Sequence, residues 1–320
     1  MRFKPRITVV TVTYGDRWRY LKKNIDILKG IDLIEEIIVV DNGSSYNIKE
    51  KLIEYPNVTL INLGENQGSA RGFKIGIQRF LKKKKTLDLK QQEKNWILLL
   101  DDDNYIKEIN VDRMINCLST SNVNCEAYVC IRNSRIDYYR NYRKAKYNGF
   151  LGFNLMKSKV IVNQLETYEM LPYSGILLSQ RAIEKIGYPD ENFYLYCDDY
   201  EYSFRLAKNN IVVKLLDFCL IEDMEESWNK KSSNFAVNIV NGDPLKVYYS
   251  VRNRIYFEKN NLTSNYFLYF CNLTLFLVYL MYRNIKSRNK MHLKSLQAIF
   301  RGILDGLRGK IGIHKKYVLK

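Results

Sequence analysis

Short apolar runs alternate with amphipathic segments along the first hundred residues of this chain. The strand-like runs, rich in Val, Ile and Leu, are residues 7–13, 37–41, 58–62 and 96–100. The helix-like segments are residues 18–29, residues 48–55 and the segment that the loop 64–72 opens. Because strand and helix recur with a period of roughly thirty residues, the pattern predicts right-handed βαβ units and a mostly parallel sheet.

The expected strands are apolar throughout rather than alternating, which favours burial on both faces of the sheet. After Asn104 the pattern weakens. Strands are still predicted at 127–131, 173–179 and 211–216, and helices at 180–186 and after the acidic pair at 198–199. Residues 137–153 show no clear period, and we expect a loop there, close to the site.

From Pro244 onward the composition changes to long helices, so the sequence predicts a domain over 1–243 and a basic helical region over 244–320. Residues 266–282 carry no charge, but their length falls short of the roughly 20 residues of a membrane span. A buried or interfacial helix is the favoured interpretation. Downstream, Lys and Arg interleave with Leu, Ile and Phe between 286 and 304, the pattern of a basic amphipathic helix that lies on an anionic membrane surface.

The length, charge and cysteine content of the chain allow a large enzyme and limit its binding partners and its compartment. The chain has 320 residues and a formal charge of +17, which suits nucleic acid, anionic lipid or phosphorylated substrates without choosing among them. The six cysteines form no CxxC pair and no zinc spacing with histidine, so we expect them to be reduced and buried. Residues 1–6 lead into a strand without an apolar signal core, which predicts a cytoplasmic protein.

Three carboxylates, Asp101, Asp102 and Asp103, directly follow the buried run 96–100. Ligands bind at the carboxyl ends of strands in open α/β sheets, and such dense negative charge calls for a cation. Oxygen ligands alone favour a hard divalent ion, Mn²⁺ or Mg²⁺, which in turn holds a substrate diphosphate. The alternative is an ordinary turn or helix cap.

Two other loops end at the same expected edge of the sheet. They are Thr13-Tyr14-Gly15-Asp16 and Asp41-Asn42-Gly43, so three loops should converge on one crevice. The loop Asn66–Gly72 then opens a helix whose N-terminal amides could face a phosphate, with Arg71 adding a positive charge. Tight turns and a simple helix cap are the alternatives, and the loop matches neither a Walker nor a Rossmann fingerprint.

A second acidic pair, Asp198-Asp199, follows several aromatic residues that could stack on a sugar. Adjacent residues on a helix point in different directions, so the two carboxylates should have different tasks. One could take the proton of an acceptor hydroxyl while the other orients it, since crowded carboxylates raise one another's pKa. The alternative is a helix N-terminus whose acids favour the helix dipole.

Together these motifs resemble the family 2 glycosyltransferases of GT-A fold, over about residues 5–260. The resemblance rests on the order of the first strand, Val40–Ser44, Asn66–Arg71, Asp101–Asp103 and Asp198-Asp199-x-Glu201. It implies inverting transfer of a sugar from a nucleotide diphosphate to a hydroxyl of a glycan or a polyprenyl-diphosphate-linked acceptor, in cell-surface polysaccharide synthesis. The acidic motifs look most like the galactofuranosyltransferase branch, which uses UDP-galactofuranose. A rhamnosyltransferase that uses dTDP-rhamnose is the alternative.

The resemblance also implies roles for residues. Asp101 and Asp103 would hold Mn²⁺ or Mg²⁺, Asp199 would remove the acceptor proton, and Asp198 would bind acceptor hydroxyls. The residues expected to bind the nucleotide sugar are Thr13, Tyr14, Asp41, Asn66, Arg71 and Asp102.

One departure from the family concerns the metal. Members often place a metal-binding His some twenty residues after the base, where this chain has Leu220-Ile-Glu-Asp-Met224. Either Glu222 or Asp223 would substitute, or the metal has one protein ligand fewer, and we favour Glu222.

Two other classes of protein are alternatives to an enzyme. A basic nucleic-acid-binding protein would interleave aromatic and basic residues on one platform, but here the strand ends are acidic, so we expect no nucleic-acid partner. An inactive scaffold with this fold is the second alternative. The sequence predicts a peripheral location at the inner face of the cell membrane and leaves the oligomeric state open.

Overall fold

The computed structural model describes residues 4–84, 95–119, 126–136, 139, 159–162, 165–225, 239, 242–286 and 293–319. The chain forms two compact units. The first, here called the sheet unit, comprises Met1–Tyr142, Lys159–Asp190 and Asp199–Glu225. The second, the helical unit, comprises Arg143–Ser158, Glu191–Asp198 and Glu226–Lys320. The predicted domain boundary between 243 and 244 stays a prediction.

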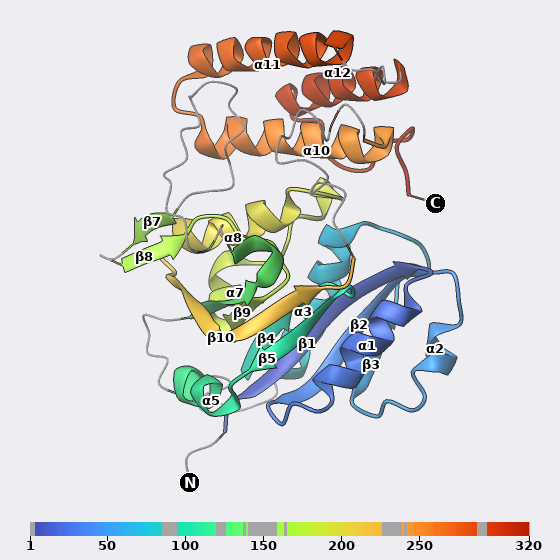
Figure 1. Ribbon diagram of the computed structural model, residues 1–320, viewed down its shortest axis with the longest axis vertical. Coiled ribbons are helices and arrows are strands. Elements are labelled where there is room, and N and C mark those ends of the chain that lie inside the picture. The colour runs from blue at the N-terminus through green and yellow to red at the C-terminus, as the bar shows by residue number, and fades with distance from the viewer. Residues whose placement is uncertain are drawn as a thin grey trace. The chain divides into compact units, whose positions relative to one another are not determined.

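The sheet unit is built on eight strands in the order β3-β2-β1-β4-β9-β6-β10-β5 (Figure 1). Within the described residues, four of its seven strand pairings are parallel, which agrees with a mostly parallel sheet. The strands are β1 (Arg6–Gly15), β2 (Ile34–Ser44), β3 (Val58–Asn62), β4 (Asn95–Leu99), β5 (Asn104–Ile109), β6 (Ala127–Arg132), β9 (Ile176–Ser179) and β10 (Val213–Asp223). A separate hairpin pairs β7 (Lys159–Val162) with β8 (Leu165–Tyr168).

Helices pack on both faces of this sheet because its central strands β1, β4, β6 and β9 are almost fully buried on both sides. Val10 and Val12 of β1 belong to one core cluster, and Ile7 and Val9 belong to the other, as the two-residue period of a strand requires. The first cluster receives α3 (Ser69–Lys84), α7 (Gln180–Ile186) and α8 (Asp198–Lys208). The second receives α1 (Trp18–Leu28), α2 (Ile48–Lys51) and α5 (Val111–Ser119).

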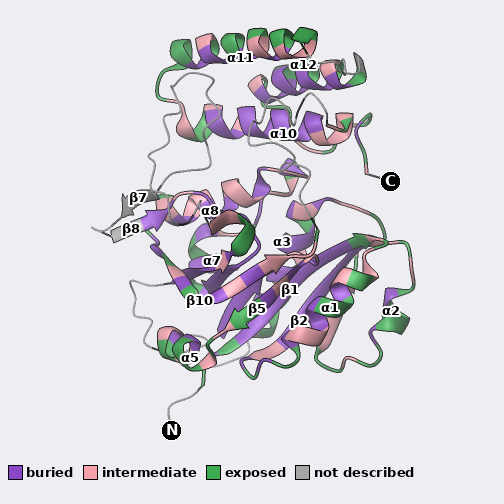
Figure 2. Ribbon diagram, viewed as in Figure 1, coloured by how far each residue is buried: buried purple, intermediate pink, exposed green. Residues whose placement is uncertain are grey.

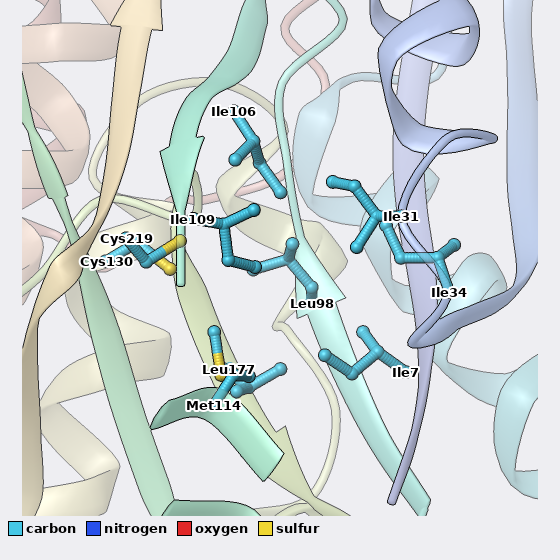
Figure 3. Close-up of a pocket in the computed structure, with 10 residues that line it drawn as sticks. All are labelled: Ile7, Ile31, Ile34, Leu98, Ile106, Ile109, Met114, Cys130, Leu177 and Cys219. Atoms are coloured by element: carbon cyan, nitrogen blue, oxygen red, sulfur yellow. The ribbon is translucent and has the colours of Figure 1, made fainter. Parts of the chain in front are cut away.

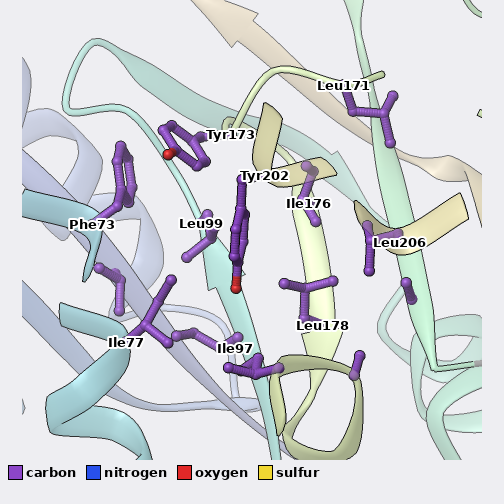
Figure 4. Packing of buried hydrophobic residues seen from close by; sticks show 14 of the residues in the cluster. Phe73, Ile77, Ile97, Leu99, Leu171, Tyr173, Ile176, Leu178, Tyr202 and Leu206 are labelled. Atoms are coloured by element: carbon purple, nitrogen blue, oxygen red, sulfur yellow. The ribbon is translucent and has the colours of Figure 1, made fainter. Parts of the chain in front are cut away.

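Tight packing fixes the elements that carry the acidic motifs. Figure 4 shows Tyr173 beside Phe73 of α3, and Tyr202 of α8 beside Leu99 of β4. The Phe73 and Tyr173 rings lie 4.3 Å apart. A Cβ on Gly76 would lie only 2.3 Å from Cγ1 of Val10, so α3 rests almost directly on β1. This contact holds the start of α3 at the carboxyl end of the parallel strands.

A hydrophobic pocket opens on the other face of the sheet, beside α5 (Figure 3). Its lining consists only of Ile, Leu, Met and Cys side chains, among them Ile7, Leu98 and Cys219. Because no charged or hydroxyl group faces it, this pocket offers no group for the transfer chemistry.

Most strands and helices expected from the sequence are present, and the differences have physical causes. The sequence pattern missed β5 and α5, and β10 extends beyond Leu216 to Asp223. The edge strand β5 is half polar and exists because it pairs with β10, more than one hundred residues later in the chain. The helix predicted at 48–55 ends at Lys51. The loop predicted at 137–153 lies outside the described residues except for Tyr139.

The cysteines that the structure describes form no disulfide. Cys130, Cys197 and Cys219 are buried. Cys117 and Cys271 are partly exposed, so the expectation of burial is wrong for these two. Cys125 lies outside the described residues.

The helical unit packs α10 (Pro244–Phe257), a π-helical turn (Glu258–Leu262), α11 (Tyr266–Lys286) and α12 (Leu293–Leu307). The Asp243 side chain caps α10 by accepting the Leu245 amide at 3.0 Å, and Pro244 occupies the first turn. Two glycines bring α12 close to α10. A Cβ on Gly306 would lie 2.6 Å from the Arg252 carbonyl oxygen, so any larger residue there would force the helices apart.

Candidate active site

The carboxyl ends of β1, β2 and β4 bring the predicted loops together. Thr13 of β1 is aligned with Asp41 of β2, and the Thr13 hydroxyl donates to Asp102 after β4 at 2.7 Å. The Asp41 side chain accepts the Ser44 amide at 2.7 Å, which closes its own turn. The convergence follows from parallel strands, whose carboxyl ends meet at one edge of the sheet.

Asp102 is the structural centre of this edge. It is 3% exposed and accepts hydrogen bonds from Thr13 and, at 2.9 Å, from the Nε of Arg17. Arg17 also pairs with Asp103 and with Glu225, each at 2.8 Å. Desolvation raises the pKa of Asp102 to about 6, although Arg17 acts in the opposite direction. The buried carboxylate therefore holds Arg17 in place, and Arg17 ties three acidic side chains together.

Asp101 is fixed by its backbone while its side chain stays accessible. Its amide donates to the Ser174 hydroxyl at 3.3 Å, and its carbonyl accepts from the Asn24 amide at 3.3 Å. The side chain is 37% exposed and lies 3.9 Å from the Arg132 guanidinium. Desolvation raises the pKa of Asp101 to about 7, against the charge of Arg132 and together with the charges of Asp103, Asp102 and Asp199. Asp101 is thus an electron-rich, crowded carboxylate that would gain from a bound cation.

Asp199, in the first turn of α8, belongs to the same electrostatic site. Its carboxylate accepts the backbone amide of the next residue, Tyr200, at 2.9 Å. Desolvation raises the pKa of Asp199 to about 6, against the opposing charges of Arg135 and Arg132. Arg135 itself donates to the Tyr200 hydroxyl at 3.2 Å. Because Asp199 contributes to the pKa of Asp101, the proposed base and the proposed metal ligand lie within electrostatic reach of each other.

Asp198, the first residue of α8, is 3% exposed, while Asp199 is only half-buried. The loop before the pair is strained: Tyr194, Tyr196 and Cys197 all have positive φ, which costs a residue other than glycine about 1–3 kcal/mol. Asn253 of α10 holds this loop by donating to the carbonyls of Phe193 at 2.7 Å, Leu195 at 2.6 Å and Tyr196 at 2.9 Å. Asn253 therefore fixes the loop that leads to Asp198 within the helical unit.

The expected third ligand, Glu222, is not brought to this cluster. Its carboxylate accepts from the Tyr105 hydroxyl at 2.7 Å and from Lys107 at 3.1 Å. The next residue, Asp223, accepts from Asn104 at 2.8 Å and from Arg132, the same arginine that lies beside Asp101. Consecutive strand residues face opposite sides, so only one of the two can reach the site, and the structure places Asp223 there.

A divalent metal fits the residues that the structure brings together, with few protein ligands. In the part of the chain that the structure describes, no group of three or more His, Cys, Asp or Glu side chains is arranged to hold a metal ion. Asp101 and Asp103 supply two carboxylates, and Mg²⁺ is commonly held by one or two carboxylates with substrate phosphates. The assignment of Asp101 and Asp103 as metal ligands stays a prediction, and the position of Glu222 does not support it as a third ligand.

Asn42 organises the loop that carries Asn66 and Arg71. Its side chain donates to Asn66 Oδ1 and to the Gly68 carbonyl, both at 3.1 Å, and accepts the Gln67 amide at 2.8 Å. Gly43 has φ of +87°, and a Cβ there would lie 2.9 Å from the Asn66 nitrogen. Asn66 therefore belongs to the loop's own structure, whereas Arg71 is exposed in the first turn of α3.

Three residues of the site were not expected from the sequence: Arg17, Arg132 and Arg135. Arg17 follows the end of the first predicted strand, and Arg132 directly follows the strand predicted at 127–131, so their positions carried a signal. No sequence feature marked Arg135, because its place depends on α8, far along the chain.

Known proteins resemble this chain in sequence and in fold. The model for glycosyl transferase family 2 matches residues 8–185, more than half of the chain. A dTDP-rhamnosyl transferase, RfbF of Shigella flexneri, is 26% identical over 261 residues, which are 80% of each chain.

Two solved structures show the same fold at low sequence identity. A mannosyltransferase from Pyrobaculum calidifontis in complex with GDP-Man and Mn²⁺ aligns with TM-score 0.53 and 13% identity, over 96% of this chain and 75% of the other. GalNAc-T7 with UDP, GalNAc and Mn²⁺ aligns with TM-score 0.50 and 13% identity, over 91% and 59%. These likenesses confirm the predicted GT-A fold, and the match of the family model shows that the chain belongs to glycosyl transferase family 2.

Proposed function

We propose that this glycosyltransferase moves rhamnose from dTDP-rhamnose to a hydroxyl of a glycan or lipid-linked acceptor, with inversion and with a divalent metal. The observation that carries the proposal is the single electrostatic site formed by Asp101, Asp103 and Asp199 at the carboxyl edge of the sheet. The donor follows from the RfbF relative, whose likeness spans 80% of both chains. For this reason dTDP-rhamnose replaces UDP-galactofuranose, which the sequence motifs favoured, as the proposed donor.

Asp199 is suited to act as the general base. Its pKa of about 6 leaves it mostly ionised at neutral pH, yet basic enough to take a proton in the transition state. The acceptor oxygen would form the new bond to the anomeric carbon from the side opposite the diphosphate, and its proton would pass to the Asp199 carboxylate. Attack from that side inverts the configuration. Asp198 is proposed to orient the acceptor hydroxyls.

Asp101 and Asp103 are the residues proposed to hold Mn²⁺ or Mg²⁺. When bound, the metal would supply Lewis-acid stabilisation of the negative charge that develops on the departing diphosphate. Arg71 is proposed to contact the ribose or the diphosphate. Arg17 keeps Asp103 in place, because it pairs with both Asp102 and Asp103 at 2.8–2.9 Å. The role of Asp102 is accordingly positioning rather than direct contact with the nucleotide sugar.

Asp41, with Thr13 and Tyr14, is proposed to line the site for the nucleobase. Uracil and thymine present the same polar atoms on their pairing edge and differ by the thymine methyl group. A carboxylate partner therefore accepts either base, and the choice between dTDP and UDP must be measured.

A thermal-shift panel tests the donor, because a ligand that binds the native state raises the apparent stability. We expect dTDP-rhamnose with Mn²⁺ to raise the melting temperature more than UDP-galactofuranose or GDP-mannose does. Stabilisation by UDP-galactofuranose alone, with turnover of that donor, would restore the galactofuranose assignment.

The Asp199→Asn variant tests the mechanism. It should keep the donor-induced thermal shift and lose transfer, because only the proton acceptor is removed. The exposed Asp217, which pairs with Arg113 at 2.9 Å, provides a matched control. Near-normal turnover by Asp199→Asn would refute the assignment of the base, while loss of activity in Asp217→Asn would point to a general effect of such substitutions.

A further inference from the structure

Helix α11 is divided lengthwise into a covered face and an open face. Its buried side chains recur every three or four residues, and three of them, Leu273, Phe276 and Leu280, belong to the core cluster that includes residues of α10 and α12. The Tyr269 hydroxyl, on the covered face, donates to the buried Glu258 carboxylate at 3.0 Å. These contacts fix which side of α11 faces outward.

The outward side of α11 is apolar from end to end except for Thr274, whose hydroxyl donates to the Phe270 carbonyl at 2.9 Å. Phe267, Val278 and Ile285 are 79%, 58% and 82% exposed, and their spacing of about three and two helical turns places them on one line. Figure 2 shows exposed positions along α11 from end to end. The other large apolar residues exposed on this helix are Tyr266, Leu268, Phe270, Leu275, Met281 and Tyr282. Monomeric soluble proteins rarely expose so continuous an apolar surface without a partner for it.

The charge of the surrounding chain identifies that partner. Residues 266–320 contain eleven Lys and Arg but one acidic residue, Asp305, so the formal charge of this segment is +10. Asp305 is 1% exposed and bonds to the Tyr248 hydroxyl at 3.0 Å and to Arg301 at 2.7 Å. No exposed carboxylate therefore offsets the cations in the described part of this segment. Lys286, Lys294 and Arg308 are all exposed.

We propose that the open face of α11, with these cations, binds the surface of an anionic lipid bilayer. Apolar side chains would enter the boundary between head groups and acyl chains, and the cations would contact anionic head groups. A second copy of the chain is a poorer occupant, because two segments of charge +10 repel each other.

The helix lies on the surface rather than across the bilayer. With 21 residues and an 18-residue window of mean hydropathy 1.2, α11 is long and apolar enough to span a membrane, contrary to the expectation from residues 266–282 alone. Spanning, however, would surround its covered face with hydrocarbon. That face packs in one core with α10, and it hydrogen-bonds to Glu258, which pairs with Arg254 at 2.9 Å. If α11 crossed the bilayer, it would either have to separate from this buried ion pair or carry the pair into the lipid, and both changes cost much free energy.

Vesicle sedimentation of the full-length protein tests the proposal. We expect binding to vesicles that contain phosphatidylglycerol, weaker binding to pure phosphatidylcholine, and loss of binding at high salt, which screens surface charge. Ile285→Glu combined with Phe267→Glu should reduce partitioning by at least about tenfold, because each adds a charge that anionic lipid repels and removes an apolar contact. The control is Ile53→Glu, at a site that is 76% exposed in the sheet unit and should have no effect.

Three results would overturn the proposal. The first is equal partitioning of the wild type and the double variant onto vesicles. The second is bound protein that resists an alkaline wash, which removes proteins from a membrane surface. The third is a protein that does not bind vesicles but forms concentration-dependent dimers, which the double variant no longer forms. Donor binding in solution provides an independent measurement, so a failure here is distinguishable from a failure of the proposed transfer reaction. The double variant should keep the donor-induced thermal shift, which shows that it is folded.

Discussion

Replacement of Asp101 by Asn should make the metal-free protein more stable while abolishing its response to metal. Asp101 has a folded-state pKa of about 7, so the fold favours its neutral form. A carboxyl group with a raised pKa contributes its full stability when protonated, and that stability is lost as the pH rises from its unfolded value through about 7. Asn mimics the neutral form at every pH, so the variant should gain stability at pH above 7.

The size of the gain follows from the pKa shift and the exposure of the side chain. A rise from 3.8 to about 7, at about 1.4 kcal/mol per unit, gives an upper limit of about 4 kcal/mol. The side chain is 37% exposed, and part of the pKa shift comes from three neighbouring carboxylates whose charges solvent screens. We therefore reduce the expected gain in stability to about 1–2 kcal/mol. For a unit of 150–250 residues, each kcal/mol corresponds to about 2–4 °C in melting temperature.

Thermal denaturation at pH 7.5 and pH 5, with and without Mn²⁺, measures the effect. At pH 7.5 without metal, Asp101→Asn should melt a few degrees above the wild type. At pH 5 the difference should shrink, because the loss of stability builds up between the unfolded pKa of 3.8 and the folded pKa of about 7, and pH 5 lies near the start of that range. Addition of Mn²⁺ with the donor should stabilise the wild type but not the variant. Asp217→Asn, whose carboxylate is 66% exposed, should change neither value.

A lower melting temperature of metal-free Asp101→Asn at pH 7.5 would refute the reasoning, because it would show that the ionised carboxylate stabilises the fold. An unchanged response to Mn²⁺ would instead remove Asp101 from the proposed metal ligands while leaving the electrostatic argument intact.

Three further outcomes follow from the structure. Because Asp199 must be ionised and has a pKa of about 6, kcat/KM should fall about tenfold per pH unit below pH 6. The Arg135→Gln variant removes a positive charge that lowers the pKa of Asp199, so in this variant the fall should begin at higher pH. A pH–rate profile that the variant leaves unchanged would contradict this. Asn253→Ala removes the amide group that donates to three carbonyls of the strained loop before α8. We expect kcat to drop at least about tenfold with little change in the binding of the nucleotide sugar, and equal kcat values would show that these hydrogen bonds are dispensable. Gly76→Ala should lower stability by about 1–3 kcal/mol in denaturant unfolding, because its Cβ would meet Val10 at 2.3 Å, whereas Gly30→Ala, with its nearest atom at 3.5 Å, should not.

The sequence alone determined the order of the elements from β1 to β4 and the edge of the sheet that carries the chemistry. Apolar runs set the strands, and the residues after each run, such as Thr13, Asp41 and Asp101, had to meet because parallel strands end at one edge. That result needs only local patterns and the handedness of βαβ units. Nothing in it depends on contacts between distant parts of the chain.

Only the tertiary structure decided which carboxylates face one another. The choice between Glu222 and Asp223 depends on the register of β10, whose pairing with β6 shifts between Leu216 and Leu220 and so changes which of its later residues face the site. A shift of one residue turns a side chain to the opposite face, and no local pattern predicts it.

The same limit applies to the arginines of the site and to the apolar face of α11. The partners Arg17 and Asp102 are 85 residues apart in the chain, and the covered side of α11 is set by its packing on α10 and α12. Pairing over such separations is a property of the folded chain, because it depends on how whole elements pack rather than on the residues next to each group.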